Sequence, residues 1–260
     1  MSTFRLQQFS IDQSLSGMKV CSDSLLFGAI IPVKDAKNIL DIGTGTGLLT
    51  LMQAQKISAL NSLSPFYITA IELTEAAAIE ADRNFKNSPW SNSIELIHQS
   101  IQNFTQNWQE GDNKKETFDL IISNPPFFAD HQRTNLNNEL RGLARHTDSL
   151  SYAELLFSIS VLLSDDGRAY VLLPIITLDQ IITIAGIEGL KIRQKTYISE
   201  SKKHPSKVVM VEFIKSSGNE GDAEPCIDRE KTIYKFDAEG QHTSEVQQHL
   251  SDFLLRYEKS

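Results

Sequence analysis

The 260-residue sequence contains no apolar run that approaches the roughly 20 residues needed to cross a bilayer. Its N-terminus lacks the basic and apolar regions of a secretory signal peptide. It has only two cysteines, Cys21 and Cys226, which lie too far apart in the chain to indicate a disulfide framework. We therefore expect a cytoplasmic protein without a membrane segment, and its 40% of hydrophobic residues suffices for a real core.

Metal-binding patterns are lacking as well. The six histidines show no close spacing with cysteines or carboxylates of the kind that builds a metal site. We therefore expect no metal ion. These histidines are His98, His131, His146, His204, His242 and His249.

Positive charge is in the minority, with 25 basic against 33 acidic residues and a net charge of −8. This balance argues against a protein that coats nucleic acids, for which a basic surface is the usual sign. One stretch differs, because six lysines or arginines lie between Lys191 and Lys207 against a single acidic residue, Glu200. The stretch fits an edge strand whose lysines discourage aggregation, or a local phosphate-binding patch.

From residue 38 onward, strand-like and helix-like blocks alternate, which is typical of a parallel sheet covered by helices. This pattern predicts an α/β fold. Before it we expect a short strand or hairpin and a helix that starts at Ser22 or Asp23. We expect strands at 38–42, 67–73, 93–98, 118–123, 168–174, 191–199 and 207–214, and helices at 46–58, 74–88 and 151–164.

A glycine-rich turn follows the first of the core strands. A nicotinamide fingerprint, G-x-G-x-x-G, would need glycine where the chain has Leu48, and the G-K-[ST] of a Walker loop is absent. The D-x-G-x-G-x-G form is the one used for S-adenosylmethionine, with an acidic residue at the amino-acid end and glycines that leave room for ribose and sulfonium. Its residues here are Asp41, Gly43, Thr44, Gly45 and Gly47.

Two further strand ends complete the predicted cofactor site. Glu72 closes the next strand, 31 residues after Asp41, where a carboxylate accepts hydrogen bonds from a ribose diol. Many such enzymes have an aspartate at the third strand end to bind the adenine of the cofactor. Here Ser100 and the backbone of Ile101 would take that place.

Residues 123–128, SNPPFF, follow the apolar run FDLII. Asn124 and Pro125 each precede a proline, so both are restricted to extended conformations. The side-chain carbonyl of Asn124 and the backbone carbonyl of Pro125 then point in fixed directions and suit an –NH2 group on a planar system. Alone, the motif also fits a strand terminator whose phenylalanines belong to the core.

Accepting both hydrogens of such an amine favours a pyramidal nitrogen whose lone pair faces the methyl sulfonium. Pro126 stiffens the loop, and Phe127 and Phe128 would stack on a base that has left its own stack. No strong base is needed, because the proton can leave after methyl transfer.

With these motifs the chain resembles the class I S-adenosylmethionine-dependent methyltransferases that carry N-P-P-[FY]. More narrowly it resembles the bacterial tRNA1(Val) adenine-N6 methyltransferases, from about Phe4 to Phe213, through DIGTGTGLLTLMQAQ, FDLIISNPPFF and LARHTDSL. The family usually has Gly-Thr-Asp-Gly where this chain has Cys21 to Ser24.

This resemblance implies a Rossmann-like, mostly parallel seven-stranded sheet with an antiparallel last strand and helices on both faces. It implies N6 methylation of the adenine beside the anticodon of one valine tRNA, with S-adenosyl-L-homocysteine as product, and we expect a monomer. Lys19 and Asp23 would border the cofactor, Asn124 would also contact it, and basic residues would contact the tRNA. These are Arg133, Arg141, Arg145 and His146 after the catalytic loop, and Lys202 and Lys203 further away.

We expect three parts along the chain. Residues 1–35 form a segment that packs on the cofactor site, residues 36–216 the methyltransferase domain, and residues 217–260 an acidic linker and a C-terminal helix. Three alternatives remain open: N2 methylation of a guanine in ribosomal RNA, N5 methylation of a glutamine in a protein, and an RNA-binding module without activity.

Overall fold

A computed structural model describes residues 3–15, 17, 19–33, 35–60, 65–111, 117–125, 150–216 and 229–257. Several predicted site residues lie outside these ranges, and their roles stay predictions: Pro126, Phe127, Phe128, Arg133, Arg141, Arg145 and His146.

Within the described residues, one central sheet has eight strands in the order β10-β8-β9-β7-β6-β3-β4-β5. Neighbouring strands are parallel except where β9 pairs with β7 and β8. The predicted mostly parallel sheet with an antiparallel seventh strand is therefore confirmed, and β10 adds an eighth strand from the expected linker region. The strands are β3 (Asn38–Ile42), β4 (Tyr67–Glu72), β5 (Ile94–His98), β6 (Phe118–Ser123), β7 (Leu163–Pro174), β8 (Leu190–Ser199), β9 (Val208–Lys215) and β10 (Arg229–Tyr234).

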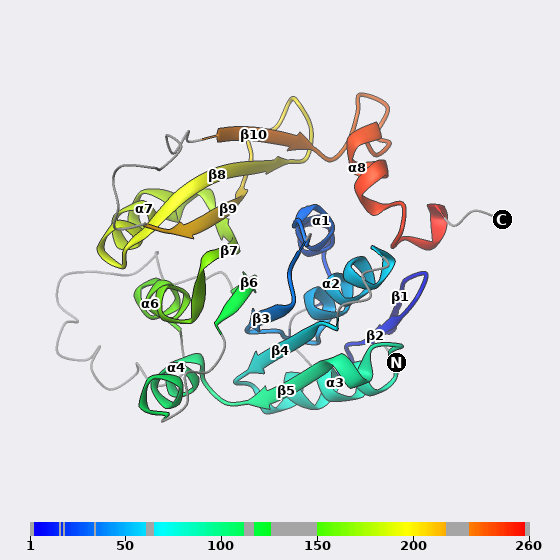
Figure 1. The fold of residues 1–260 in the computed structure, drawn as a ribbon. Coiled ribbons are helices and arrows are strands. Elements are labelled where there is room, and N and C mark those ends of the chain that lie inside the picture. The colour runs from blue at the N-terminus through cyan, green and yellow to red at the C-terminus, as the bar shows by residue number, and fades with distance from the viewer. Residues whose placement is uncertain are drawn as a thin grey trace, which may run out of the picture.

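Helices cover both faces of the sheet (Figure 1). One buried cluster joins the sheet to α1 (Ser22–Ile30), α2 (Leu48–Ala59), α3 (Glu75–Lys86) and α8 (Ser244–Leu250). A second cluster joins the other face to α4 (Ile101–Glu110), α6 (Tyr152–Leu162) and α7 (Leu178–Ile187). Short 3-10 helices lie at η1 (Ser91–Ser93), η3 (Ile175–Thr177) and η4 (Leu255–Tyr257).

The strands supply both clusters because their side chains alternate between the two faces. In β3, Ile39 faces the first cluster, while Leu40 and Ile42 face the second. Tyr170 and Val171 divide in the same way in β7. This alternation explains why strands buried on both faces read as continuous apolar runs in the sequence.

The two ends of the chain lie against each other. The predicted N-terminal hairpin is present as β1 (Thr3–Arg5) and β2 (Ser10–Asp12), which pair antiparallel. The side chain of Gln7 donates to the backbone carbonyls of Ser251 and Leu254 at 2.8 and 2.9 Å. The C-terminal segment therefore packs beside α1 and the hairpin (Figure 1).

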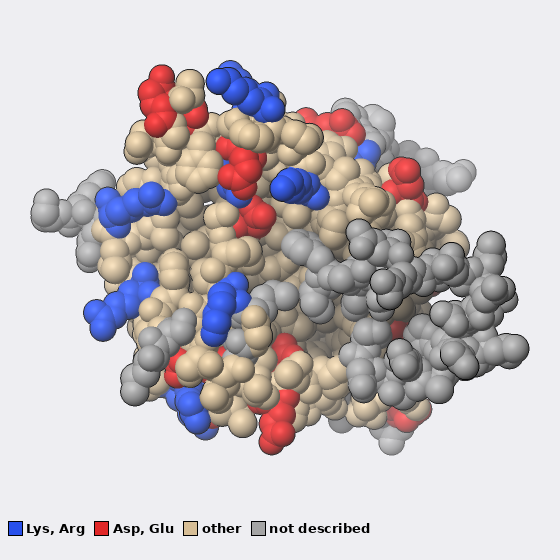
Figure 2. All heavy atoms as spheres, turned by 180° about the vertical axis from the view of Figure 1, so that it is seen from behind, with Lys and Arg blue, Asp and Glu red and all other residues tan. Residues whose placement is uncertain are grey.

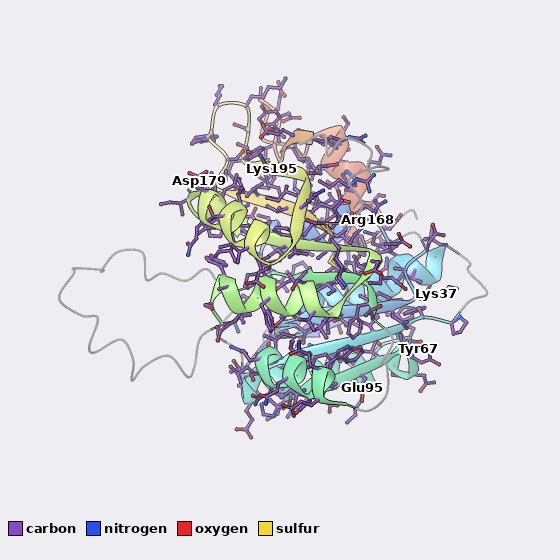
Figure 3. The ribbon with its side chains drawn as sticks, turned by 60° about the vertical axis from the view of Figure 1, so that its left-hand side comes forward. Lys37, Tyr67, Glu95, Arg168, Asp179 and Lys195 are labelled. Carbon is purple, nitrogen blue, oxygen red and sulfur yellow. The ribbon has the colours of Figure 1, made fainter. Side chains whose placement is uncertain are left out.

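The parallel strands define two opposite edges of the sheet. Lys37, Tyr67, Glu95 and Arg168 mark the edge at the amino side of the strands (Figure 3). The carboxyl ends of β3, β4, β5 and β6 meet at the other edge, where ligands bind in open α/β sheets. Among the described residues, no helix has the length and apolar character that a membrane crossing requires.

Candidate active site

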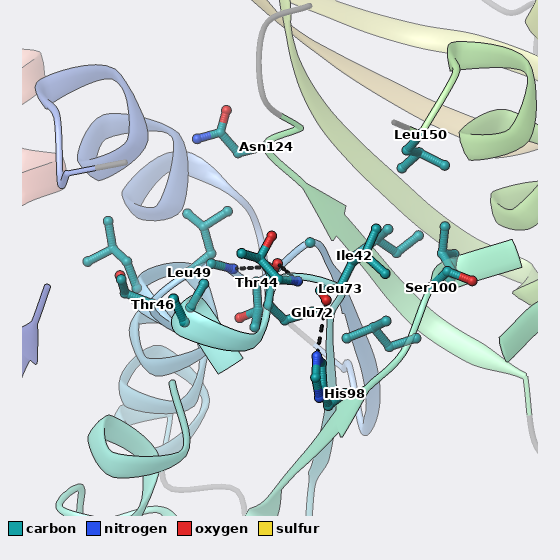
Figure 4. A pocket seen from close by; sticks show the side chains of 18 of the residues that line it. Ile42, Thr44, Thr46, Leu49, Glu72, Leu73, His98, Ser100, Asn124 and Leu150 are labelled. Carbon is teal, nitrogen blue, oxygen red and sulfur yellow. Dashed lines mark hydrogen bonds between the residues drawn. The ribbon is translucent and has the colours of Figure 1, made fainter. Parts of the chain in front are cut away.

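A cavity of about 1080 Å³ opens at the carboxyl edge of β3, β4, β5 and β6 (Figure 4). Its walls come from the turn after β3, the end of β4, the start of α4, Asn124 and the segment that leads into α1. Of the predicted cofactor residues, those that line the cavity are Lys19, Gly43, Thr44, Gly45, Glu72, Ser100, Ile101 and Asn124.

The turn of residues 43–47, here called the glycine loop, needs glycine for two different reasons. Gly43, Gly45 and Gly47 all have positive φ, at 70°, 59° and 88°. Apart from its chain neighbours, a Cβ on Gly43 or Gly45 would meet no atom of the described residues within 4 Å, so these two leave open space beside the cavity. A Cβ on Gly47 would lie 2.3 Å from Phe85 of α3, so this glycine serves close packing and does not line the cavity.

Asp41 lies under the glycine loop and is fully buried. Its Oδ2 accepts hydrogen bonds of 2.7 Å from the hydroxyls of both Thr44 and Thr50, which ties the loop to the start of α2. Burial raises the pKa of Asp41 to about 6, and these two hydrogen bonds oppose the rise. Its Oδ1 has no hydrogen-bond partner among the described residues. Asp41 therefore stabilises the glycine loop through hydrogen bonds and does not itself line the cavity.

Glu72 is fixed at the edge of the cavity. One carboxylate oxygen accepts from the backbone N–H of Gly45 at 2.8 Å, and the other accepts from the N–H of Thr74 at 2.7 Å. Thr74 is the N-cap residue of α3, but its side chain makes no capping hydrogen bond. Glu72 thus joins the end of β4 to the glycine loop. It is 8% exposed and lines the cavity.

The far wall of the cavity begins at the end of β5. Ser100 caps α4 by accepting from the N–H of Asn103 at 3.2 Å, and Ile101 begins the helix. His98 also lines the cavity, with its Nε2 3.1 Å from the carbonyl oxygen of Leu73 (Figure 4). From the sequence His98 was weighed only as a metal ligand, although its place at the end of a strand was a signal for this wall.

Asn124 follows β6, whose last residue, Ser123, donates a hydrogen bond of 2.8 Å to the carbonyl of Ile42 in β3. The amide nitrogen of Asn124 donates to the hydroxyl of Ser24 in α1 at 2.9 Å, and Pro125 is buried. Ser24 also lines the cavity and was not among the residues predicted from the sequence. A serine in the first turn of a helix is common and gave no signal of this contact.

Lys19 and Asp23, the two residues expected to border the cofactor, differ in position. Lys19 lines the cavity, and its ammonium group donates to the backbone carbonyl of Gln13. Asp23 does not line it, and instead accepts a hydrogen bond from Lys235 at 2.8 Å. Lys235 also pairs with Glu200. Burial lowers the pKa of Lys235, but the hydrogen bonds to Asp23 and Glu200 outweigh it and hold that pKa above its usual value.

The basic stretch divides into two environments. Lys202 and Lys203 are exposed in the turn of residues 200–207, here called the basic turn. Because β8 runs parallel to β6 and β7, this turn lies at the same edge of the sheet as Asn124. Lys195, by contrast, is 7% exposed and pairs with Glu230 of β10 at 3.3 Å. The edge-strand interpretation is wrong, since β8 lies between β10 and β9.

Solved structures resemble the fold at low sequence identity. A predicted O-methyltransferase from Agrobacterium tumefaciens superposes with a TM-score of 0.59 and 18% identity, over 87% of this chain and 94% of that one. A class I S-adenosylmethionine-dependent methyltransferase from Listeria monocytogenes gives 0.54 and 14%, over 80% and 62%. The fold and the glycine-loop site define a class I S-adenosylmethionine-dependent methyltransferase.

Comparison with curated sequences narrows this class. Residues 15–147 match the family model of the methyltransferase small domain. A tRNA1(Val) (adenine(37)-N6)-methyltransferase from Shewanella sediminis is 35% identical over 98% of this chain and 99% of its own length. Proteins of the same name from Shewanella baltica (strain OS195) and Proteus mirabilis are 38% and 34% identical over 98% of this chain, and over 99% and 94% of their own. The chain belongs to the tRNA1(Val) (adenine(37)-N6)-methyltransferase family within the methyltransferase small domain proteins.

Proposed function

We propose that this protein transfers the methyl group of S-adenosylmethionine to the exocyclic N6 amine of adenine 37, beside the anticodon, in tRNA1(Val). The observation that carries this proposal is the position of Asn124, which projects from the end of β6 into the cavity formed by the glycine loop and Glu72. The choice of substrate follows from the relatives named tRNA1(Val) (adenine(37)-N6)-methyltransferase, which match this chain over nearly their whole length.

The residues of the cavity suit S-adenosylmethionine. The open space beside Gly43 and Gly45 admits a ligand close to the backbone, and Glu72 offers acceptors for a ribose diol. Ser100 and Ile101 form the wall expected to face the adenine of the cofactor. When bound, the cofactor supplies an electrophilic methyl group on a sulfonium.

Asn124 and Pro125 act on the substrate amine. The amide nitrogen of Asn124 is already engaged with Ser24, so its oxygen is the group left to accept from the amine. The backbone carbonyl of Pro125 accepts the second N–H. These dipoles orient the lone pair toward the methyl group and stabilise the charge that develops on nitrogen, without a strong base. Phe127 and Phe128 remain the predicted stacking partners of the flipped adenine.

The tRNA is expected to contact the carboxyl edge of the sheet beyond the target base. Lys202 and Lys203 lie at this edge, three strands away from β6 in the order β6-β7-β9-β8. At about 4.8 Å a strand this is roughly 14 Å, which suits a contact to phosphates away from the target nucleotide. Figure 2 shows that basic and acidic side chains are mixed over the described part of the molecule's back, which disfavours broad RNA contact there. Arg133, Arg141, Arg145 and His146 remain predicted contacts near the base.

The test uses purified protein and labelled S-adenosylmethionine in parallel reactions with total tRNA, ribosomal RNA and total protein from a strain that lacks this gene. Nucleoside mass spectrometry of the product should find N6-methyladenosine, confined to one valine tRNA. Label in ribosomal RNA or in protein glutamine instead would overturn the proposed substrate while keeping the class of enzyme. We also expect the protein to act as a cytoplasmic monomer without a metal ion, which sedimentation and a chelator control check.

A further inference from the structure

Ser24 links the first helix to the catalytic asparagine. The two residues are 100 positions apart in the chain, yet the hydroxyl oxygen of Ser24 lies 2.9 Å from the amide nitrogen of Asn124. Ser24 is 7% exposed and lines the same cavity. An asparagine side chain presents two donors at one end and an acceptor at the other, so this contact decides which end faces the substrate.

A third residue, Cys21, offers an acceptor for the hydrogen of the Ser24 hydroxyl. Cys21 is the N-cap of α1, and its sulfur lies 3.1 Å from the hydroxyl of Ser24 and 3.5 Å from the N–H of Ser24. A hydroxyl has one hydrogen to donate and lone pairs to accept. When that hydrogen points at the Cys21 sulfur, the Ser24 oxygen accepts from Asn124, and the chain of hydrogen bonds runs one way from Asn124 to Cys21.

The helix that carries Ser24 is held at both ends. At its N-terminus Lys235, which is 5% exposed, donates to Ser22 at 3.0 Å and to Asp23 at 2.8 Å. At its C-terminus the ammonium group of Lys56 donates to the carbonyls of Gly28 and Ala29 at 3.2 and 2.8 Å. Positioning is most precise when it comes from a rigid element, and α1 meets this condition.

We propose that Ser24 is a positioning residue for methyl transfer, which fixes the Asn124 amide so that its oxygen faces the substrate amine. The inference rests on the proposed function for the identity of the amine. Without the Ser24 hydroxyl, the side-chain amide of Asn124 is free to flip by 180°. Its –NH2 group would then face the –NH2 group of the substrate, and neither group could accept a hydrogen bond from the other. In Figure 4 the nitrogen and oxygen of Asn124 point in different directions, and the nitrogen is the atom bound to Ser24.

A double-mutant cycle tests this role. Single-turnover rates with enzyme in excess are compared for wild type, Ser24→Ala, Asn124→Ala and the double variant. Ser24→Ala should slow methyl transfer by about 5–30-fold in the wild-type background and by less than about twofold beside Asn124→Ala. An equal loss in both backgrounds would mean that Ser24 acts through folding or cofactor binding, and would overturn the proposal.

Matched variants separate positioning from a general disturbance of α1. Ser22→Ala removes a hydroxyl from the same turn that contacts Lys235 instead of Asn124. It loosens the N-terminus of α1, where Lys235 keeps its hydrogen bond to Asp23, and it should slow methyl transfer less than Ser24→Ala does. Cys21→Ala removes the acceptor at the end of the hydrogen-bond chain Asn124–Ser24–Cys21 and should slow methyl transfer by about two- to fivefold. Cys21→Ser keeps an acceptor at this position and should transfer the methyl group at the wild-type rate. Equal rates for Cys21→Ala and wild type, together with an unchanged Ser24→Ala rate, would overturn the proposal.

A measurement without turnover separates this inference from the identity of the substrate. In a protein labelled with ¹⁵N at asparagine, the Asn124 side-chain amide hydrogens should exchange with solvent several-fold faster in Ser24→Ala than in wild type. If the wild type methylates another amine, the same cycle is run on that product. If no N6-methyladenosine is formed but the Asn124 amide hydrogens exchange faster in Ser24→Ala, only the proposed substrate is refuted. If these hydrogens exchange equally fast in Ser24→Ala and wild type, the proposed role of Ser24 is refuted.

Discussion

The carboxylate of Glu72 accepts a hydrogen bond from the backbone N–H of Gly45 at 2.8 Å, which connects the end of β4 to the loop that follows β3. Both residues line the cavity. The same carboxylate accepts from the N–H of Thr74 at the start of α3. Glu72 therefore connects two walls of the proposed cofactor site, and its change should affect cofactor affinity more than the chemical step.

Glu72→Gln keeps the size of the side chain but removes its charge. Hydrogen bonds to charged groups contribute about 1.5–3 kcal/mol, so the Kd for S-adenosylmethionine should rise by about 10–100-fold. Isothermal titration calorimetry measures this change. Glu75→Gln, on the exposed start of α3, is the matched control and should leave the Kd unchanged. Equal affinities for Glu72→Gln and wild type would remove Glu72 from the cofactor site.

Asn124→Ala should separate binding from chemistry. The variant loses an oriented acceptor at the reacting amine, and losing one such group costs about 10²–10³-fold in turnover. Because the glycine loop and Glu72 are untouched, the Kd for S-adenosylmethionine should stay within about threefold of wild type. Rates come from single-turnover methylation of tRNA, and affinity from calorimetry. Wild-type turnover in this variant would contradict the mechanism.

Local features of the fold and site were predictable from the sequence, because their signals lie within a few residues of one another. The glycine loop, Glu72 and the N-P-P stretch each stand at the end of an apolar run, and the parallel sheet brings those ends together. The sequence did not separate the roles of the three glycines. Gly47 contacts Phe85 of α3, a partner that no local pattern shows.

Features that depend on distant partners were not predictable. Lys235 meets Asp23 across 212 positions and thereby removes a predicted cofactor residue from the cavity. Strand β10 was missed because Ile233 is its one buried side chain and its first three residues are charged. Its register places Glu230 beside Lys195, so charge pairing rather than apolar alternation marks this strand.

The double change Lys202→Glu and Lys203→Glu should weaken tRNA binding without slowing chemistry. Each lost phosphate contact lowers affinity and reduces the salt dependence of binding. We expect the KM for tRNA to rise by about 10-fold or more, with kcat changed less than about twofold. Steady-state kinetics at several salt concentrations measures both.

Lys191→Glu is the control for this change. Lys191 is exposed and lies at the start of β8, the strand that leads into the basic turn, and so at the opposite edge of the sheet. It should leave the KM close to wild type. An equal rise for both variants would indicate a general effect of charge and would contradict a specific contact at the basic turn.

The ionisation of Asp41 should make stability depend on pH. Because burial raises its pKa from 3.8 to about 6, the folded protein binds more protons than the unfolded chain between these values, and the free energy of unfolding falls as the pH rises through this range. Asp41→Asn removes this titration and keeps an oxygen for Thr44 and Thr50. Relative to wild type, the variant should gain about 3 kcal/mol between about pH 4 and about pH 7.5, measured by urea unfolding without cofactor. A constant difference between Asp41→Asn and wild type across this range would mean that the pKa of Asp41 is not raised.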